Sequence, residues 1–118
     1  MNVEKQRELY RSLNKKSTLE DIQKYIGEMN IVREFNDDEV EDRMLLLMEE
    51  VGELAKAIRK EKMTMGIDTD KIQNYSSSKE EAADVFYVLI SVCDLLNISL
   101  IDALLEKEAI NITRSWNV

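Results

Sequence analysis

Hydrophobic residues along the chain recur at intervals of three and four, a spacing that places them on one face of an α-helix. The first such run follows Ser17 and Thr18, whose hydroxyls can accept hydrogen bonds from the free amides at a helix N-terminus. Glu20 or Asp21 then suits the positive end of the helix dipole. The pattern predicts four helices, which we expect at about residues 17–29, 38–62, 79–96 and 99–116.

Two stretches lie outside these predicted helices. Residues 1–16 are predicted to form an N-terminal arm or a short helix, and polar residues 63–78 are predicted to form a loop. Because 118 residues leave no room for a second independent core, we expect residues 1–118 to form a single domain. Proline is absent and glycine occurs only three times, which favours the same fold class, an all-α bundle of four to five helices.

The segment at 79–96 differs from the other predicted helices because apolar residues cover nearly its whole circumference. A helix of that kind is buried on all sides, and one small domain can hardly surround it. We therefore expect a second copy of the chain to cover part of it, in a homodimer or a homotetramer. Its apolar residues are Ala82, Ala83, Val85, Phe86, Val88, Leu89, Ile90, Val92, Cys93, Leu95 and Leu96.

The composition excludes several classes of function. The chain has 16 basic and 24 acidic residues, so its net charge of −8 (16 − 24) opposes binding to a nucleic-acid backbone. It has no histidine, which rules out His-based zinc sites and Ser-His-Asp triads. Three glycines, at 27, 52 and 66, cannot form either common glycine-rich phosphate loop. Any phosphate chemistry would therefore depend on carboxylates and a metal ion.

The sequence also bears on cellular location. Residues 1–16 lack the apolar segment of a signal peptide, and the longest nearly apolar run, residues 85–96, is too short to span a bilayer. The single Cys93 cannot form an internal disulfide, which fits a reducing cytosol. We expect a soluble cytoplasmic protein with no membrane partner.

Two pairs of acidic residues stand out within the predicted helices. Glu50 and Glu53 are three residues apart, with Glu49 beside them, and Glu81 and Asp84 repeat that spacing. Residues at positions i and i+3 lie on one face of a helix, about one turn apart. Each pair can therefore direct both carboxylates to a single point.

If the two pairs face each other across antiparallel helices, each pair of charges repels by about 3 kcal/mol at roughly 5 Å and an effective dielectric near 20. A hard divalent cation would offset this repulsion, and all-oxygen ligation favours Mg²⁺, with Mn²⁺ possible, over zinc. Asp84 stands among apolar neighbours, so we expect it to be buried and either paired or metal-bound. Gly52 weakens its helix by about 1 kcal/mol relative to alanine, which predicts close approach of another backbone or a ligand.

A structural explanation exists for each acidic residue. An acidic pair at this spacing is usually a solvated helix face, and Ser77 or Ser78 precedes Glu80 or Glu81 by three residues, as in a helix capping box. A capping box and a metal site are compatible at this helix start, because Ser77 with Glu80 can make the cap and leave Glu81 free to bind a metal ion.

The two acidic pairs, with their order and flanks, resemble a known family. Glu50-Val-Gly-Glu53, followed after 27 residues by Glu81-Ala-Ala-Asp84, is similar to the ExxE…ExxD signature of the MazG-like all-α nucleoside triphosphate pyrophosphohydrolases. The flanking sequences LLLMEEVGELAKAIRK and EEAADVFYVLISVCDLLNISL agree, and the resemblance extends over about residues 18–116.

The resemblance implies an activity and roles for named residues. Relatives split a nucleoside triphosphate, ribo or deoxyribo, into the monophosphate and pyrophosphate, with Mg²⁺ held by residues corresponding to Glu50, Glu53, Glu81 and Asp84. Glu49 or a ligand such as Glu50 would orient the attacking water. The family also places a Lys, an Asn and an Arg near the substrate phosphates, and the matching residues on the last predicted helix are Lys107, Asn111 and Arg114. Where several relatives carry an aromatic residue against the base, this chain has Val88, which leaves its base preference open.

A second hypothesis belongs to another class of protein. The chain would be a catalytically silent, oligomeric helical module that binds a nucleotide or a protein as a regulator. Stabilisation by Mg²⁺ or Mn²⁺ would distinguish the two, because only a protein with the metal site should melt at a higher temperature in their presence.

Overall fold

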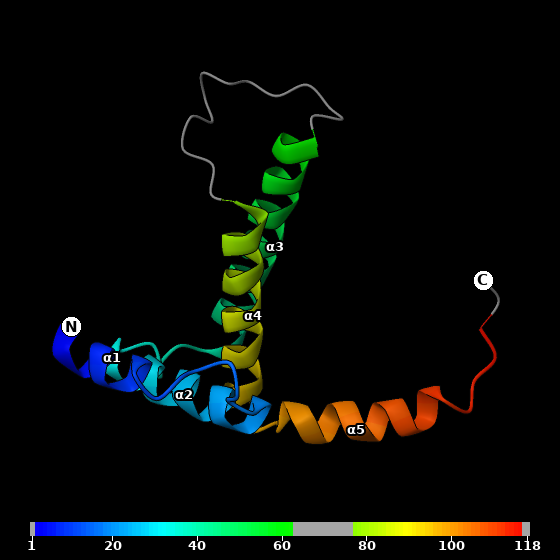
Figure 1. Cartoon of the computed structure of the whole chain (residues 1–118), viewed down its shortest axis with the longest axis horizontal. Helices are drawn as coiled ribbons and strands as arrows, with labels where there is room; N and C mark the ends of the chain where they lie inside the picture. Colours follow the sequence, from blue (N-terminus) through cyan, green and yellow to red (C-terminus); the bar gives the residue numbers. More distant parts are fainter. Residues whose placement is uncertain (1, 63–76, 117–118) are drawn as a thin grey trace. The chain divides into compact units, whose positions relative to one another are not determined.

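The computed structural model describes residues 2–62 and 77–116, and within them it contains helices and turns but no strand (Figure 1). The all-α fold class is therefore confirmed. Most of the loop predicted at 63–78 lies outside the described residues. The helices are α1 (Val3–Tyr10), α2 (Leu19–Val32), α3 (Val40–Lys62), α4 (Ser78–Leu95) and α5 (Leu100–Asn111).

The helices divide between two compact units. One unit holds the residues up to Asp37 and those from Cys93 onward, and so contains α1, α2 and α5. The other is Asp38–Val92, which contains α3 and most of α4. Each unit is described separately below.

In the first unit, α2 begins at the predicted place and is fixed by a capping box. The Thr18 hydroxyl accepts a hydrogen bond from Asp21 N at 3.1 Å, and the Asp21 carboxylate accepts one from Thr18 N at 2.9 Å. Both bonds favour the ionised acid and lower the pKa of Asp21. The helix α1 packs on α2, where the Arg33 side chain donates from Nε to Gln6 Oε1 at 3.0 Å.

Gln23 on α2 fixes the start of α5. Its side-chain amide donates to the Ile98 carbonyl at 2.6 Å and accepts from Leu100 N at 3.1 Å. A Cβ at Gly27, one turn further along α2, would lie 3.3 Å from a carboxylate oxygen of Asp94. The small residue therefore lets the Asp94 side chain approach the helix closely.

In the second unit, α3 and α4 lie side by side and run in opposite directions (Figure 1). Asp38 precedes α3, and its Oδ2 lies 2.7 Å from Nη2 of Arg43. The charge of the buried Arg43 is therefore compensated by an ion pair. Ala57 on α3 and Ile90 on α4 are among the buried residues. The antiparallel pair of α3 and α4 therefore forms the framework of this unit.

The single chain buries only part of the circumference of α4, and cover of the rest by a second copy stays a prediction. Val88 and Ile90 are buried, but Phe86 is 40 % exposed and Leu89 is 38 % exposed. The single chain is too small to cover the whole circumference of an apolar helix. Apolar residues on α3 are exposed as well, namely Met44, Leu45, Met48, Val51 and Ile58.

The last helix is shorter than predicted, because α5 ends at Asn111 and not near Trp116. The residues that follow, Ile112 and Thr113, are β-branched and so are poor helix formers. The Thr113 hydroxyl also donates to the Ile110 carbonyl at 2.6 Å, which competes with the regular helical hydrogen bonds. Arg114 therefore lies beyond the helix and does not continue the helical face of Lys107 and Asn111.

Among the described residues, no single helix combines the length and the apolar composition of a membrane span; α4 and α5 meet the criterion only when taken together as a bent pair.

Candidate active site

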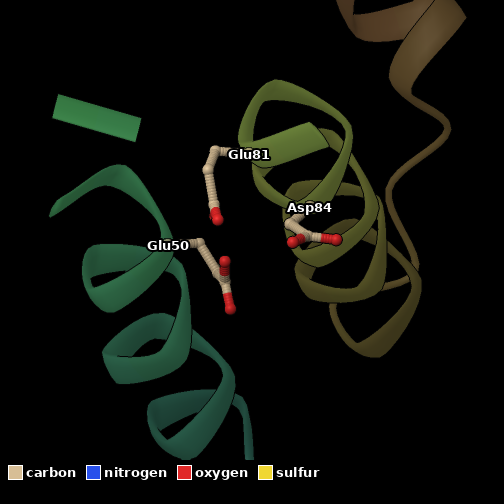
Figure 2. Close-up of side chains that lie close together, drawn as sticks. All are labelled: Glu50, Glu81 and Asp84. Carbon is tan, nitrogen blue, oxygen red and sulfur yellow. The ribbon is translucent and has the colours of Figure 1, made fainter. Parts of the chain in front are cut away.

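Three of the four predicted metal ligands lie together between α3 and α4. Glu50, Glu81 and Asp84 each have a carboxylate oxygen within 4.8 Å of the others, and the side chain of Glu81 points toward Glu50 (Figure 2). Glu50 comes from the middle of α3, whereas Glu81 and Asp84 come from the start of α4. The i, i+3 spacing on α4 thus brings both of its acids to a point facing α3.

The cap of α4 leaves Glu81 free for this cluster, as the sequence suggested. Ser77 Oγ accepts a hydrogen bond from Glu80 N at 3.1 Å, and Ser77 O accepts one from Glu81 N at 3.0 Å. The Ser77 side chain thus caps the helix through Glu80. The side chain of Glu81 remains directed at Glu50.

The buried acid is Glu81 and not Asp84, so the expectation of a buried Asp84 is wrong for the single chain. Glu81 is 7 % exposed, Glu50 is half-buried and Asp84 is exposed. The apolar neighbours of Asp84 in the sequence lie around the circumference of α4, part of which the chain leaves uncovered. Apolar neighbours in the sequence therefore do not predict that a residue on a helix is buried.

The carboxylates of the cluster place negative charges close to one another. Burial raises the pKa of Glu50, and the charges of Asp84, Glu81, Glu53 and Glu49 raise it further. At about 5 Å and an effective dielectric near 20, two ionised carboxylates repel by roughly 3 kcal/mol. A bound cation would relieve this repulsion.

The donor set fits a hard divalent cation. Three carboxylates gathered at one point provide only oxygen ligands, which suits Mg²⁺ or Mn²⁺, and these ions keep further positions for water or substrate. Glu81 is the most deeply buried of the three acids, and burial of an unpaired charge is costly.

Glu53 and Glu49 are not part of the cluster of three carboxylates. Glu53 is exposed, and its Oε1 lies 3.6 Å from Lys56 Nζ on the following turn of α3. Glu49 is exposed, and its charge is the smallest of the contributions that raise the pKa of Glu50. The charge of Glu53 also raises the pKa of Glu50, although Glu53 stands outside the group of three carboxylates.

Gly52 was expected to allow close approach of a backbone or ligand. Apart from its two chain neighbours and the nearby backbone of its own helix, a Cβ at Gly52 would meet no atom of the described residues within 4 Å. The structure of the single chain therefore gives no reason for a glycine at this position.

The three predicted phosphate-binding residues belong to the first unit, so the structure does not test their place beside the acids. Lys107 is exposed on α5, and the Asn111 side chain donates to Glu108 Oε1 at 3.1 Å. Arg114 lies over the ring of Trp116, with 4.6 Å from Cζ to the ring centroid, and donates to Asn111 Oδ1 at 3.4 Å. The two-residue spacing of Arg114 and Trp116 was the only signal in the sequence for this cation–π contact.

The region that contains the carboxylate cluster matches a known protein family. The family model of the MazG nucleotide pyrophosphohydrolase domain matches residues 38–115, more than half of the chain. The match includes all three residues of the carboxylate cluster and leaves α1 and α2 outside it. No curated protein and no solved structure matches the chain. The chain belongs to the family of MazG nucleotide pyrophosphohydrolase domains.

Proposed function

We propose that this protein is a Mg²⁺-dependent nucleoside triphosphate pyrophosphohydrolase, which cleaves NTPs or dNTPs to the monophosphate and pyrophosphate. The observation that carries the proposal is the meeting of Glu50, Glu81 and Asp84 within 4.8 Å, inside the region that matches the family. Its role would be to remove unwanted or non-standard nucleotides in the cytoplasm.

Each acid has a separate task in this proposal. Glu50, Glu81 and Asp84 hold the metal ion, and Glu53 joins them by leaving its ion pair with Lys56. A divalent cation held by these residues would supply neutralisation of the triphosphate charge and a lower pKa for a water molecule. Glu49 or Glu50 orients the attacking water through its carboxylate.

The phosphate groups would be held by cationic and amide side chains. Arg114 binds phosphate oxygens as a planar fork, Lys107 binds them as a point charge, and Asn111 donates from its amide. The exposed apolar residues of α3 and α4 support assembly as a homodimer or a homotetramer, which would cover Phe86 and Leu89. Such an assembly also allows the acids of one subunit to meet the basic residues of another.

The test is the release of monophosphate and pyrophosphate from a panel of NTPs and dNTPs, with Mg²⁺ and with a chelator. We expect metal-dependent release in equal amounts from at least one nucleotide. Release of inorganic phosphate alone would contradict cleavage between the α and β phosphates. Silence across the panel with Mg²⁺ and with Mn²⁺ would favour the catalytically silent binding module.

A further inference from the structure

A second contact joins α3 to α4, at the end of α3 and one turn before Glu81 on α4. Glu61, in the last turn of α3, accepts two hydrogen bonds from Ser78, the first residue of α4. Its Oε1 lies 2.8 Å from Ser78 N, and its Oε2 lies 2.7 Å from Ser78 Oγ. Both carboxylate oxygens are thus bound to one residue, which fixes the orientation as well as the distance.

The contact is more than a helix cap, because α4 is already capped. The Ser77 hydroxyl accepts from Glu80 N, whereas Glu61 takes the separate amide of Ser78. A carboxylate at this end of α4 also meets the positive end of the helix dipole. The two hydrogen bonds lower the pKa of Glu61, so the carboxylate is ionised when it binds Ser78.

The Glu61–Ser78 contact lies on the same faces of α3 and α4 as the carboxylate cluster. Glu61 follows Glu50 by 11 residues (61 − 50), close to three full turns, so both lie on one side of α3. Ser78 precedes Glu81 by three residues, so these two lie on one side of α4. A shift of one helix along the other that breaks the Glu61–Ser78 contact would therefore also separate Glu50 from Glu81.

Such a contact is needed because the acids themselves oppose the arrangement. Without a cation, the three carboxylates of the cluster repel one another across the α3–α4 contact. The Glu61–Ser78 contact lies about three turns from Glu50 along α3 and one turn from Glu81 along α4, and it ties the two helices together through hydrogen bonds.

We propose that Glu61 is a positioning residue, which together with Ser78 holds α3 and α4 in the register that lets Glu50, Glu81 and Asp84 bind one metal ion. This inference rests on the metal site of the proposed function. It assigns to Glu61 an effect on metal affinity, although Glu61 does not touch the metal.

The test is calorimetric titration of the full chain with Mn²⁺ at a temperature at which every variant is folded. In Glu61→Ala we expect the dissociation constant to rise about tenfold, the lower end of the range for residues that orient metal ligands. Glu61→Gln keeps an acceptor for Ser78 N and a donor for Ser78 Oγ, so its dissociation constant for Mn²⁺ should stay within about twofold of the wild type.

The matched control is Glu80→Ala, which removes an exposed acid near the start of α4 and should leave metal affinity unchanged.

The outcomes separate positioning from a purely structural role. A purely structural residue would lower the melting temperature in chelator and leave the Mn²⁺ dissociation constant of the folded protein unchanged; that result overturns the proposal. A Glu61→Gln variant as weak as Glu61→Ala also overturns it, because the effect would then come from charge. If Glu61→Ala does not fold, Ser78→Ala, which loses one of the two hydrogen bonds, must still weaken Mn²⁺ binding. A wild-type protein that binds no Mn²⁺ would overturn the metal site itself, and this proposal with it.

Discussion

Glu50 is the residue on which the competing forces of this site act most directly. It is half-buried, which disfavours its charge, and it lies within 4.8 Å of two further carboxylates. Its raised pKa is the consequence of both effects. The same arrangement that destabilises the metal-free protein provides ligands for a cation, so stability and metal affinity are opposed at this residue.

The first prediction is that Glu50→Gln melts at a higher temperature than the wild type in chelator at neutral pH. A pKa raised by folding means that the wild-type contribution to stability is complete below the unfolded pKa and is lost as the pH rises through the folded pKa. The advantage of Glu50→Gln should therefore grow with pH across the acidic range. Calorimetry over a pH series checks this, and a variant less stable than the wild type at neutral pH would contradict it.

Gly52 supports a second prediction at the same scale. Because a Cβ there meets open space in the described chain, Gly52→Ala should raise the free energy of unfolding by about 1 kcal/mol, the helix-propensity difference. Gly27→Ala is the matched control and should gain less, since its Cβ would lie 3.3 Å from Asp94. Urea unfolding measures both. An unchanged or lower stability of Gly52→Ala would show that a partner or ligand occupies the space.

Among the elements, the helix ends are set by short-range hydrogen bonds. α2 and α4 both end in the motif in which a left-handed residue closes the last turn: Glu34 has φ 62° and Asn97 has φ 55°. The amide of Phe35 reaches the Asn30 carbonyl at 2.7 Å in the first motif, and that of Ile98 reaches the Cys93 carbonyl at 2.9 Å in the second. Glycine is the usual residue at this position, so Glu34 is strained there.

The third prediction is that Glu34→Gly stabilises the protein by about 1 kcal/mol, because it relieves the left-handed conformation. Asn97→Gly should gain clearly less, since asparagine tolerates that conformation. Thermal unfolding of the two variants side by side gives the comparison. Equal gains, or a loss in Glu34→Gly, would count against strain at Glu34.

The sequence predicted the positions of most helices well, but it predicted the burial of individual side chains less well. Periodicity and the Thr18 cap located α2, α3 and α4, because these signals act within a few residues. The end of α5 was missed, since a run of weak helix formers such as Ile112 and Thr113 leaves no sharp signal. The burial of Glu81 and the exposure of Asp84 depend on what packs against α4, which periodicity alone does not contain.

For the whole molecule, the family match and the carboxylate cluster fall on the same part of the chain. The match comes from the sequence of residues 38–115, whereas the cluster comes from the antiparallel arrangement of α3 and α4. Three of the four acids predicted from spacing meet in space, and Glu53 is paired with Lys56 nearby. The spacing could predict which acids share a face but not which of them turn to a neighbouring lysine.

The central claim is that this carboxylate cluster is the catalytic metal site, and Glu81, its buried member, tests it most directly. The measurement is the rate of pyrophosphate release with Mg²⁺ from the nucleotide that the wild type hydrolyses fastest. Glu81→Gln keeps the size of the side chain and should lower the rate by about a thousandfold, as expected for losing several kcal/mol of metal-based stabilisation, while Glu80→Gln should keep it. A folded Glu81→Gln protein that releases pyrophosphate at the wild-type rate would contradict the assignment of the metal site.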